Sequence, residues 1–416
     1  MNKPFLVLPF ILLSAYCFSQ NSLPKASPES VGISSERLER LDEQMHKFVD
    51  DGQLSAVHSA IIRKGKLVHW DTYGHEDVDS DDRLKDNSIW RIYSMSKPIV
   101  SVAAMMLYEQ GHFQLNDPLY KYIPEMKDLN VHVGNGELEK AKKPIKVVDL
   151  FRHTSGIGYG WSGGYVDSLY AAADRKSMNT TAGLVKNLSK LPLYSEPGDH
   201  WRYGLSTDVL GYLVEVLSGQ PLDEYLKEHI FSPLSMNDTH FEIPDSKDDR
   251  FVTNYTTDKE TGKLKVIDAP SFSPYCKEVT FFSGGGGLAS TAEDYLRFCQ
   301  MLINGGELEG KRLLSPKTIE LMTQDHSAHA AHDGGPVVMP TFGTGFGLGF
   351  AVTKNLAYTG LTGSLGAYGW GGAAGTYFRI DPEEDLILLL MIQLMPYDHL
   401  KAREKFHTMV YQSIID

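Results

Sequence analysis

The sequence contains very little cysteine. Its 416 residues include three, Cys17, Cys276 and Cys299. Cys17 lies in an apolar N-terminal stretch, so the remainder of the chain has two cysteines and can form at most one disulfide. This excludes a small disulfide-stabilised scaffold. Neither of these two residues stands beside a histidine in a cysteine-nucleophile motif, and the sequence leaves open whether they pair.

The chain also lacks an excess of positive charge. Its 53 acidic and 40 basic residues give a formal net charge of −13, and no segment gathers Lys and Arg into a basic stripe. Nucleic-acid binding needs such a surface because it displaces condensed counterions, so we expect no nucleic-acid partner. A hydrophobic fraction of 42% and an aromatic fraction of 11% instead predict a globular core, in one large domain or two subdomains.

Beyond the N-terminus, no apolar run reaches the roughly 18 residues of a transmembrane helix. Residues 1–19 are typical of a signal peptide, with a positive Lys3, an apolar stretch over 5–16 and a small-x-small cleavage site ending before Gln20. We therefore expect a periplasmic or secreted protein without stable membrane insertion. Lipid attachment at Cys17 is the alternative, and the bulky residue before it disfavours that alternative.

Hydrophobic periodicity divides the chain into a strand-rich part at both ends and a helical middle. Helical spacing marks residues 34–50, 94–110, 209–217 and 398–415, and strand patterns mark 57–62, 67–70, 347–352, 375–380 and 386–394. The last of these strands is almost continuously apolar, which is typical of a buried strand. These patterns predict one sheet built from both ends of the chain, and a second, mostly helical subdomain between them.

Three short motifs match catalytic or ligand-binding patterns, but the sequence around each of them does not fit the corresponding site. Gly-x-Ser-x-Gly around Ser162 lacks the apolar strand that precedes a hydrolase nucleophile elbow. The glycine run 283–287 lacks the Gly-Lys-Ser/Thr or βαβ context of a phosphate loop, so a tight turn is favoured. His326, His329 and His332 recur every third residue in loop-like sequence, without the spacing usual for zinc. We expect neither a metal nor an organic cofactor.

A fourth motif, Ser94-x-x-Lys97, stands before a long apolar helix pattern. On a helix, residues three apart project from one face, so the Ser94 hydroxyl and the Lys97 amine can meet. A helix start also offers unpaired N–H groups and a positive dipole end to a developing oxyanion. The lysine can take the serine proton only if burial or nearby positive charge lowers its pKa.

Two later segments strengthen the interpretation of Ser94 and Lys97 as catalytic residues. "EPGDHWRYGLSTDVLGYLVEVLSG" places Tyr203 at the entry of a helix, and "GAYGWGGAAGTYFRI" places Trp370-Gly371-Gly372 ahead of a strand. Their order after Ser-x-x-Lys resembles the serine β-lactamase and penicillin-recognising superfamily. The likeness is strongest to its class C branch and to the related carboxylesterases with a β-lactamase fold. It extends from about residue 34 to the end of the chain.

The resemblance implies an α+β fold: an antiparallel sheet with the N- and C-terminal helices packed on it, and the site between sheet and helical subdomains. The sheet subdomain would take about 30–114 and 280–416, and the helical one about 115–279, within one hydrolase domain over 20–416. Ser94 would be the acylated nucleophile, with Lys97 and Tyr203 as base and proton relay. Backbone N–H groups of Ser94 and Ala373 would form the oxyanion hole.

The departures from the family pattern bear on the substrate. The usual Tyr-x-Asn is Tyr203-Gly204-Leu205, and the usual Lys-Thr-Gly is Trp370-Gly371-Gly372, so an amide and a carboxylate-binding cation are missing. These changes favour a neutral, apolar acyl group. We assign substrate binding to Trp370, Gly371, Gly372, Tyr159, Trp161 and Leu205. Tyr159, Trp161, Tyr165 and Trp201 either line an acyl pocket or belong to the core.

The sequence thus predicts an exported serine hydrolase that cleaves a small-molecule carboxylic ester through an acyl-enzyme. The alternative with the same mechanism is a β-lactamase or D-Ala-D-Ala carboxypeptidase acting on cell-wall peptides. An alternative of another class is a non-catalytic penicillin-recognition-type binding protein. The natural ester, its chain length and the oligomeric state are not defined by the sequence.

Overall fold

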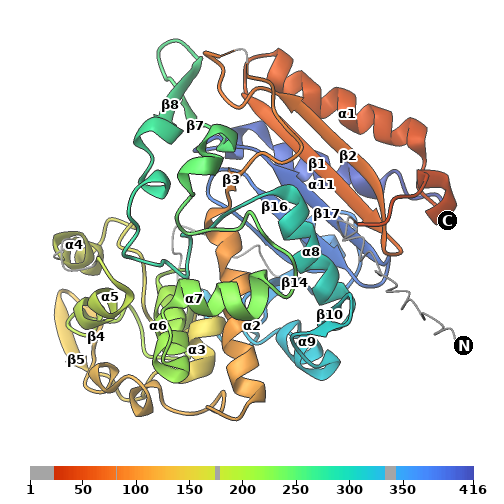
Figure 1. Ribbon diagram of the computed structural model, residues 1–416. Helices are drawn as coiled ribbons and strands as arrows, with labels where there is room; N and C mark the ends of the chain where they lie inside the picture. Colours follow the sequence, from red (N-terminus) through yellow and green to blue (C-terminus); the bar gives the residue numbers. More distant parts are fainter. Residues whose placement is uncertain (1–22, 81, 174–178, 333–342) are drawn as a thin grey trace, which may run out of the picture.

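A seven-stranded antiparallel sheet forms the centre of the described part of the molecule (Figure 1). The computed structural model describes residues 23–80, 82–173, 179–332 and 343–416, so the predicted signal peptide and Cys17 lie outside the described residues. The strand order is β13-β14-β15-β16-β17-β1-β2. In this order the strands are Thr344–Phe346, Ala351–Thr353, Tyr368–Gly371, Tyr377–Asp381, Leu386–Met391, Ala56–Arg63 and Lys66–Gly74.

Strands from the two ends of the chain meet in the middle of this sheet. β1 pairs with β17 so that Ala60 lies opposite Leu389 and Ile61 opposite Leu388. Every residue of both strands is buried, because both faces of the sheet are covered. This explains the continuous apolar pattern of 386–394 and confirms the prediction of a sheet built from both ends.

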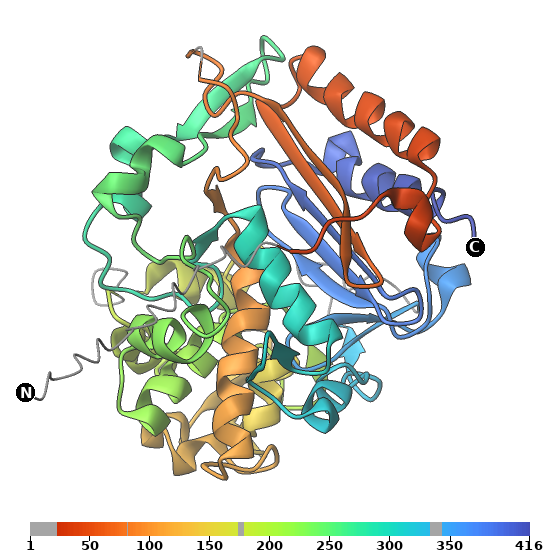
Figure 2. The same ribbon diagram turned by 45° about the vertical axis from the view of Figure 1, so that its right-hand side comes forward.

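The two faces of the sheet are covered by different helices (Figure 2). α1 (Ser35–Asp50) and α11 (Ala402–Tyr411) pack together on one face, with Val57 and Leu388 of the sheet beneath them. α8 (Ala292–Ile303) and α2 (Ser96–Glu109) cover the opposite face. The predicted α+β fold, with both terminal helices packed on an antiparallel sheet, is therefore confirmed.

The middle of the chain is mainly helical and lies beside α2. Its helices are α3 (Val147–Phe151), α4 (Tyr165–Ala172), α5 (Thr181–Leu188), α6 (Ser206–Ser218) and α7 (Leu222–Leu226). It also contains two hairpins, β4–β5 (Asn130–Gly134, Glu137–Lys140) and β7–β8 (Asn254–Thr257, Leu264–Asp268). Short pairs join β3 (Trp90–Arg91) to β9 (Ala289–Ser290), β6 (His200–Trp201) to β12 (Ala331–His332), and β10 (Glu307–Leu308) to β11 (Lys311–Arg312).

One predicted strand is interrupted. The pattern at 347–352 predicts a continuous strand, whereas the chain turns between β13 and β14 and only 351–352 belong to a strand. Gly349 has φ +96° at this turn, and a methyl group there would overlap the Ser101 hydroxyl on α2. The glycine therefore serves a tight turn packed against the helix that follows Ser94.

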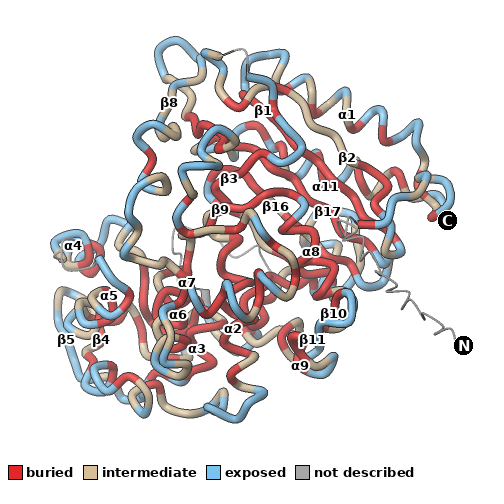
Figure 3. The backbone as a smooth tube through the Cα atoms, in the orientation of Figure 1, coloured by how far each residue is buried: buried red, intermediate tan, exposed pale blue. Residues whose placement is uncertain are grey.

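The buried residues form a continuous band through the sheet, α2, α6 and α8, and the exposed ones lie on the outer helices and loops (Figure 3). α9 (Pro316–Met322) adds the buried Ile319 and Met322 to the same core, whereas α10 (Leu356–Thr359) has no buried residue. Among the described helices, none combines the length and the apolarity that crossing a bilayer requires.

Candidate active site

Ser94 lies in the short 3₁₀ helix Tyr93–Met95, which leads directly into α2. Tyr93 has φ +42°, an uncommon conformation for a residue with a side chain. The turn is held by Ser96, whose hydroxyl donates to the Tyr93 carbonyl at 2.6 Å and accepts from the Leu288 N–H at 3.1 Å. Strained backbone of this kind is frequent at catalytic positions.

Lys97 is almost completely buried, at 1% exposure, and points its amine at Ser94. Nζ lies 3.2 Å from the Ser94 Oγ, 3.1 Å from the Tyr159 hydroxyl and 2.5 Å from the Gly285 carbonyl oxygen. An ammonium has three N–H donors, and these three acceptors match them. When the amine is neutral, two donors suffice for Tyr159 and Gly285, which leaves the lone pair free to accept the Ser94 proton.

Two tyrosines surround this amine. Tyr203, just before α6, places its ring face 4.5 Å from Nζ, and its hydroxyl accepts from Trp370 Nε1 at 3.1 Å. Tyr159 contacts Nζ directly through its hydroxyl. Burial, followed by the charges of Tyr203 and Asp208, raises the pKa of Tyr159 well above its usual value, so its phenol stays protonated. The sequence reading of Tyr159 as pocket lining missed its contact with Lys97.

The glycine run 283–287 positions the acceptor for Lys97. The Asp208 Oδ1 accepts from the Ser283 hydroxyl at 2.5 Å and from the Gly285 N–H at 3.1 Å. A methyl group at Gly285 would overlap the Asp208 carboxylate. Asp208 is 1% exposed, and this burial raises the pKa of its carboxyl group. Sequence reasoning did not select Asp208, although it lies on α6, the helix entered at Tyr203.

Trp370 and Gly371 end β15, and Gly372 leads into the turn before β16. A methyl group at Gly372 would overlap the carbonyl oxygen of Ile92, two residues before Ser94. The glycine therefore lets this turn pack on the backbone that carries Ser94. Ala373, at the tip of the turn, is exposed and lines the same cavity as Ser94.

This cavity, here called the acyl cavity, has a volume of about 460 Å³ and is open to solvent. Ser94 and Ala373 line this cavity together with apolar side chains from α4, α5 and neighbouring loops. The apolar lining consists of Tyr159, Trp161, Tyr170, Leu184, Leu188, Leu191, Leu205 and Phe281. The structure thus brings Tyr159, Trp161 and Leu205 together with Ser94, and adds the leucines of the α5 region, which sequence reasoning missed.

The other residues considered for substrate binding lie outside the acyl cavity. Trp370 donates to the Tyr203 hydroxyl, and the Tyr203 ring lies over the Lys97 amine. Gly371 and Gly372 are packed against other parts of the chain. Tyr165 is exposed near Ser162, and Trp201 is buried in a separate aromatic cluster with Tyr203 and Phe346.

The weaker motifs are placed elsewhere. Ser162 is exposed, and its hydroxyl accepts from Arg202 at 3.4 Å instead of contacting a base. The ring of His326 is bonded to the Leu321 carbonyl, and His332 pairs through its backbone with Trp201. In the described ranges, no group of three His, Cys, Asp or Glu side chains is arranged to hold a metal ion.

Comparison with known proteins extends these observations. The Beta-lactamase family profile matches residues 41–408. Protein Rv1367c of Mycobacterium tuberculosis is 33% identical over 362 residues, covering 85% of this chain and 89% of its own. Esterase EstB of Burkholderia gladioli is 27% identical, with coverage of 85% and 89%. A putative D-alanyl-D-alanine carboxypeptidase of Salmonella typhimurium is 26% identical, with coverage of 92% and 89%.

Solved structures agree in fold. EstCE1, described as a hydrolase with promiscuous acyltransferase activity, has a TM-score of 0.76 at 23% identity, covering 90% of this chain and 98% of its own. The LovD6 mutant of simvastatin synthase from Aspergillus terreus has a TM-score of 0.75 at 21% identity, with coverage of 92% and 98%. The profile match spans most of the sequence and confirms the resemblance drawn from its motifs: this chain belongs to the Beta-lactamase family and is a serine hydrolase with the β-lactamase fold.

Proposed function

We propose that this protein hydrolyses carboxylic esters with an apolar acyl group, through an acyl-enzyme on Ser94. The observation that carries the proposal is the position of Ser94 between the buried amine of Lys97 and the apolar acyl cavity. Among the described residues that line this cavity, none is a lysine or an arginine. A carboxylate on the substrate would therefore find no cationic partner there, whereas a neutral acyl chain would bury apolar surface.

The first proton transfer follows from the contact of Lys97 with Ser94, and the role of Tyr203 follows from the family resemblance. Its neutral amine takes the Ser94 proton while Oγ attacks the ester carbonyl. The N–H groups of Ser94 and Ala373 stabilise the negative oxygen of the tetrahedral intermediate. The intermediate collapses, the C–O bond to the alcohol breaks, and the alcohol leaves with a proton returned by Lys97 through Tyr203. Water then attacks the acyl-enzyme by the same route and releases the acid.

The position of the proton donors indicates where the acyl half and the alcohol half of the ester bind. The leaving alcohol must lie near Tyr203 and Lys97, because it receives their proton. Tyr203 and Trp370 do not line the acyl cavity, which extends from Ser94 toward Leu184 and Leu188. The acyl chain therefore occupies the cavity, and the alcohol leaves on the Tyr203–Trp370 side.

The relatives support more than one chemistry. Similarity to esterase EstB favours the ester, while similarity to a putative D-alanyl-D-alanine carboxypeptidase keeps the peptidase or β-lactamase alternative open. Both use the same Ser94 mechanism, so substrate preference separates them. The apolar cavity and Trp370 in place of the family's lysine support the ester.

The test is a substrate panel with the purified protein lacking residues 1–19. We expect hydrolysis of p-nitrophenyl esters, with kcat/KM rising from acetate to medium-length acyl chains, and turnover of nitrocefin and of a D-Ala-D-Ala peptide at least about 100-fold lower. Rapid nitrocefin or peptide turnover without ester hydrolysis would overturn the proposal. Absence of any turnover, together with absence of Ser94 labelling by a fluorophosphonate, would support a binding protein instead.

We also propose that the chain is exported. The proposal is supported by the charged, apolar and small-residue order of residues 1–19. N-terminal sequencing of protein made from the full gene in a bacterial host tests it. We expect a mature terminus at Gln20 in the periplasm or medium. A chain still carrying Met1 in the cytoplasm would contradict export, and a lipid-modified Cys17 would show anchoring.

A further inference from the structure

An arginine from the terminal helix reaches the turn that carries Ala373. The Arg403 guanidinium donates to the carbonyl oxygens of Gly372, Gly375 (3.1 Å) and Thr376 (2.7 Å). It also donates to the Tyr397 hydroxyl and lies 4.0 Å above the centre of that ring. One side chain, far along the chain from the motifs, thus binds three carbonyls of the turn between β15 and β16.

The sequence leaves room for this side chain. A methyl group at Gly371 would lie 2.6 Å from the guanidinium carbon of Arg403, so any other residue at position 371 would displace it. Within the described ranges, Arg403 makes no ion pair with a carboxylate; Asp398 and Glu404 act on it only at longer range. The N–H groups of its guanidinium donate to carbonyl oxygens of the turn and to the Tyr397 hydroxyl.

The geometry of a peptide bond connects this contact to the active site. The Gly372 carbonyl and the Ala373 N–H belong to one planar trans peptide unit and point in opposite directions. Because Arg403, together with the Gly375 N–H at 3.1 Å, holds the carbonyl on the α11 side of the sheet, the N–H is directed to the opposite side, where Ala373 lines the acyl cavity with Ser94. This N–H donates to no other residue in the described part of the chain.

We propose that Arg403 is a positioning residue for the oxyanion hole: by binding the Gly372 carbonyl, it orients and polarises the Ala373 N–H. A cation on the oxygen of an amide withdraws electrons and strengthens its N–H as a donor, and preorganised donors of this kind are a major source of catalysis. The proposal rests on the proposed function, because it assumes that the Ala373 N–H binds the oxyanion of a Ser94 intermediate.

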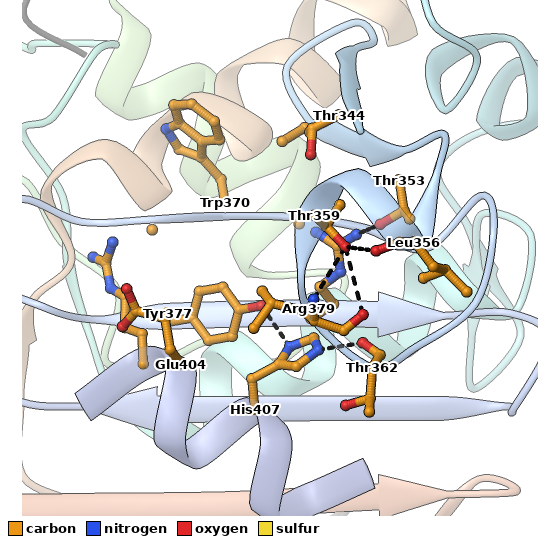
Figure 4. A pocket seen from close by; sticks show the side chains of 15 residues that line it. Thr344, Thr353, Leu356, Thr359, Thr362, Trp370, Tyr377, Arg379, Glu404 and His407 are labelled. Atoms are coloured by element: carbon orange, nitrogen blue, oxygen red, sulfur yellow. Dashed lines mark hydrogen bonds between the residues drawn. The ribbon is translucent and has the colours of Figure 1, made fainter. Parts of the chain in front are cut away.

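The chain offers a matched control in Arg379. Arg379 and Arg403 line the same cavity of about 260 Å³ behind β15. Figure 4 labels Arg379, Tyr377 and His407 in this cavity. Arg379 donates to the Thr353 hydroxyl and to a carbonyl outside the turn. Its replacement therefore removes a guanidinium from the same cavity without removing a contact to the Ala373 peptide.

The experiment compares R403Q, R403K and R379Q with the wild type, using a p-nitrophenyl ester, its thionoester and a fluorophosphonate. For R403Q we expect kcat to fall about 10- to 100-fold with KM within about threefold, and Ser94 labelling to slow by a similar factor. R403K should recover part of the loss. R379Q should stay within about threefold of the wild type. The thionoester separates positioning from general damage, because sulfur accepts hydrogen bonds weakly and its rate should fall less than that of the oxygen ester.

The results distinguish a failure of the role proposed for Arg403 from a failure of the proposed function. Equal losses on both esters, R379Q as impaired as R403Q, or unchanged labelling in a folded R403Q would overturn the role of Arg403. If circular dichroism shows that R403Q does not fold, R403K is used in its place, because lysine keeps the charge but makes fewer contacts. The role of Arg403 is then judged from the loss of rate of R403K on the oxygen ester relative to its loss on the thionoester. If the wild type is labelled on Ser94 but hydrolyses no ester, the proposed function fails, and the labelling rates alone decide the role of Arg403.

Discussion

Two glycine-rich loops meet beside Ser94. One is held by the acidic side chain of Asp208 and the other by the basic side chain of Arg403. In the loop 283–287, a buried carboxylate, Asp208, accepts from a backbone N–H, and the loop presents the Gly285 carbonyl to Lys97. In the turn 371–375, the Arg403 guanidinium donates to backbone carbonyls, and Ala373 lies exposed in the acyl cavity. In the proposed mechanism, the first loop lies on the proton-transfer side and the second on the oxyanion side.

Both loops need glycine because other parts of the chain pack closely against their backbone. Gly285 and Gly371 each leave space for the charged side chain behind the loop, and Gly372 lets the turn pack onto the backbone before Ser94. A charged group fixed behind a loop orients the peptide groups in front of it. In these two loops, glycine therefore allows close packing of the backbone beside Ser94.

The strongest way to break the first loop is Asp208→Ala. It leaves the Gly285 N–H without its acceptor and removes a negative charge near Lys97, so we expect kcat to fall about 100-fold. Asp208→Asn keeps an acceptor and should lose less. Ser283→Ala, which removes one donor to the same oxygen, is the control and should stay within about fivefold. Steady-state ester kinetics with D208A near the wild-type rate would contradict the role of this loop.

A matched pair of alanine substitutions sharpens the same point. In Gly285→Ala the new methyl group overlaps the Asp208 carboxylate, whereas in Gly286→Ala the nearest atom, the Tyr93 carbonyl carbon, is 3.7 Å away. We expect about a 30-fold loss of kcat for G285A and less than about threefold for G286A, because only the first displaces the acceptor of Lys97. Equal losses in the two variants would show that the position of the Gly285 carbonyl is not decisive.

The acyl cavity lies between the two loops and can be changed without touching either. Leu188→Trp should fill the part of the cavity lined by α5. We expect kcat/KM for medium-chain p-nitrophenyl esters to fall about tenfold while the acetate ester is hardly affected. Leu213→Met, in the core away from the cavity, is a control for packing changes. An unchanged chain-length profile in L188W would place the acyl chain elsewhere.

The smallest expected effect is a change in the pH dependence of stability, caused by a histidine on the α11 side of the turn 371–375. His407 on α11 is buried between Tyr377 and the Thr362 carbonyl, and burial lowers its pKa to about 4. The unfolded chain binds this proton near pH 6.5, so the native state loses stability as the pH falls from 6.5 toward 4, by at most about 3 kcal/mol. His407→Gln should flatten this part of the pH–stability curve measured by urea unfolding. A curve with unchanged slope would show that His407 does not carry the effect.

The sequence predicted what depends on local order. The Ser94–Lys97 pair needs only three residues of helical spacing, and the terminal helices follow from their apolar periodicity. The strand at 347–352 was predicted too long, because its alternation does not reveal the tight turn at Gly349.

The rest of the site depends on contacts between distant segments. Tyr159 meets Lys97 across 62 residues, Asp208 meets Gly285 across 77, and Arg403 meets Gly372 across 31. Each residue type is common, and no spacing distinguishes these three from other tyrosines, aspartates and arginines. Only the packing of helices onto the sheet brings them to the catalytic backbone.

We propose Ser94 as an acylated nucleophile that is activated by Lys97. Incubation with a fluorophosphonate, followed by intact-mass measurement and peptide mapping, tests it most directly. We expect one adduct per chain, on Ser94, that disappears in Ser94→Ala and forms much more slowly in Lys97→Met. An adduct on Ser162, or the absence of any adduct on folded protein, would contradict it.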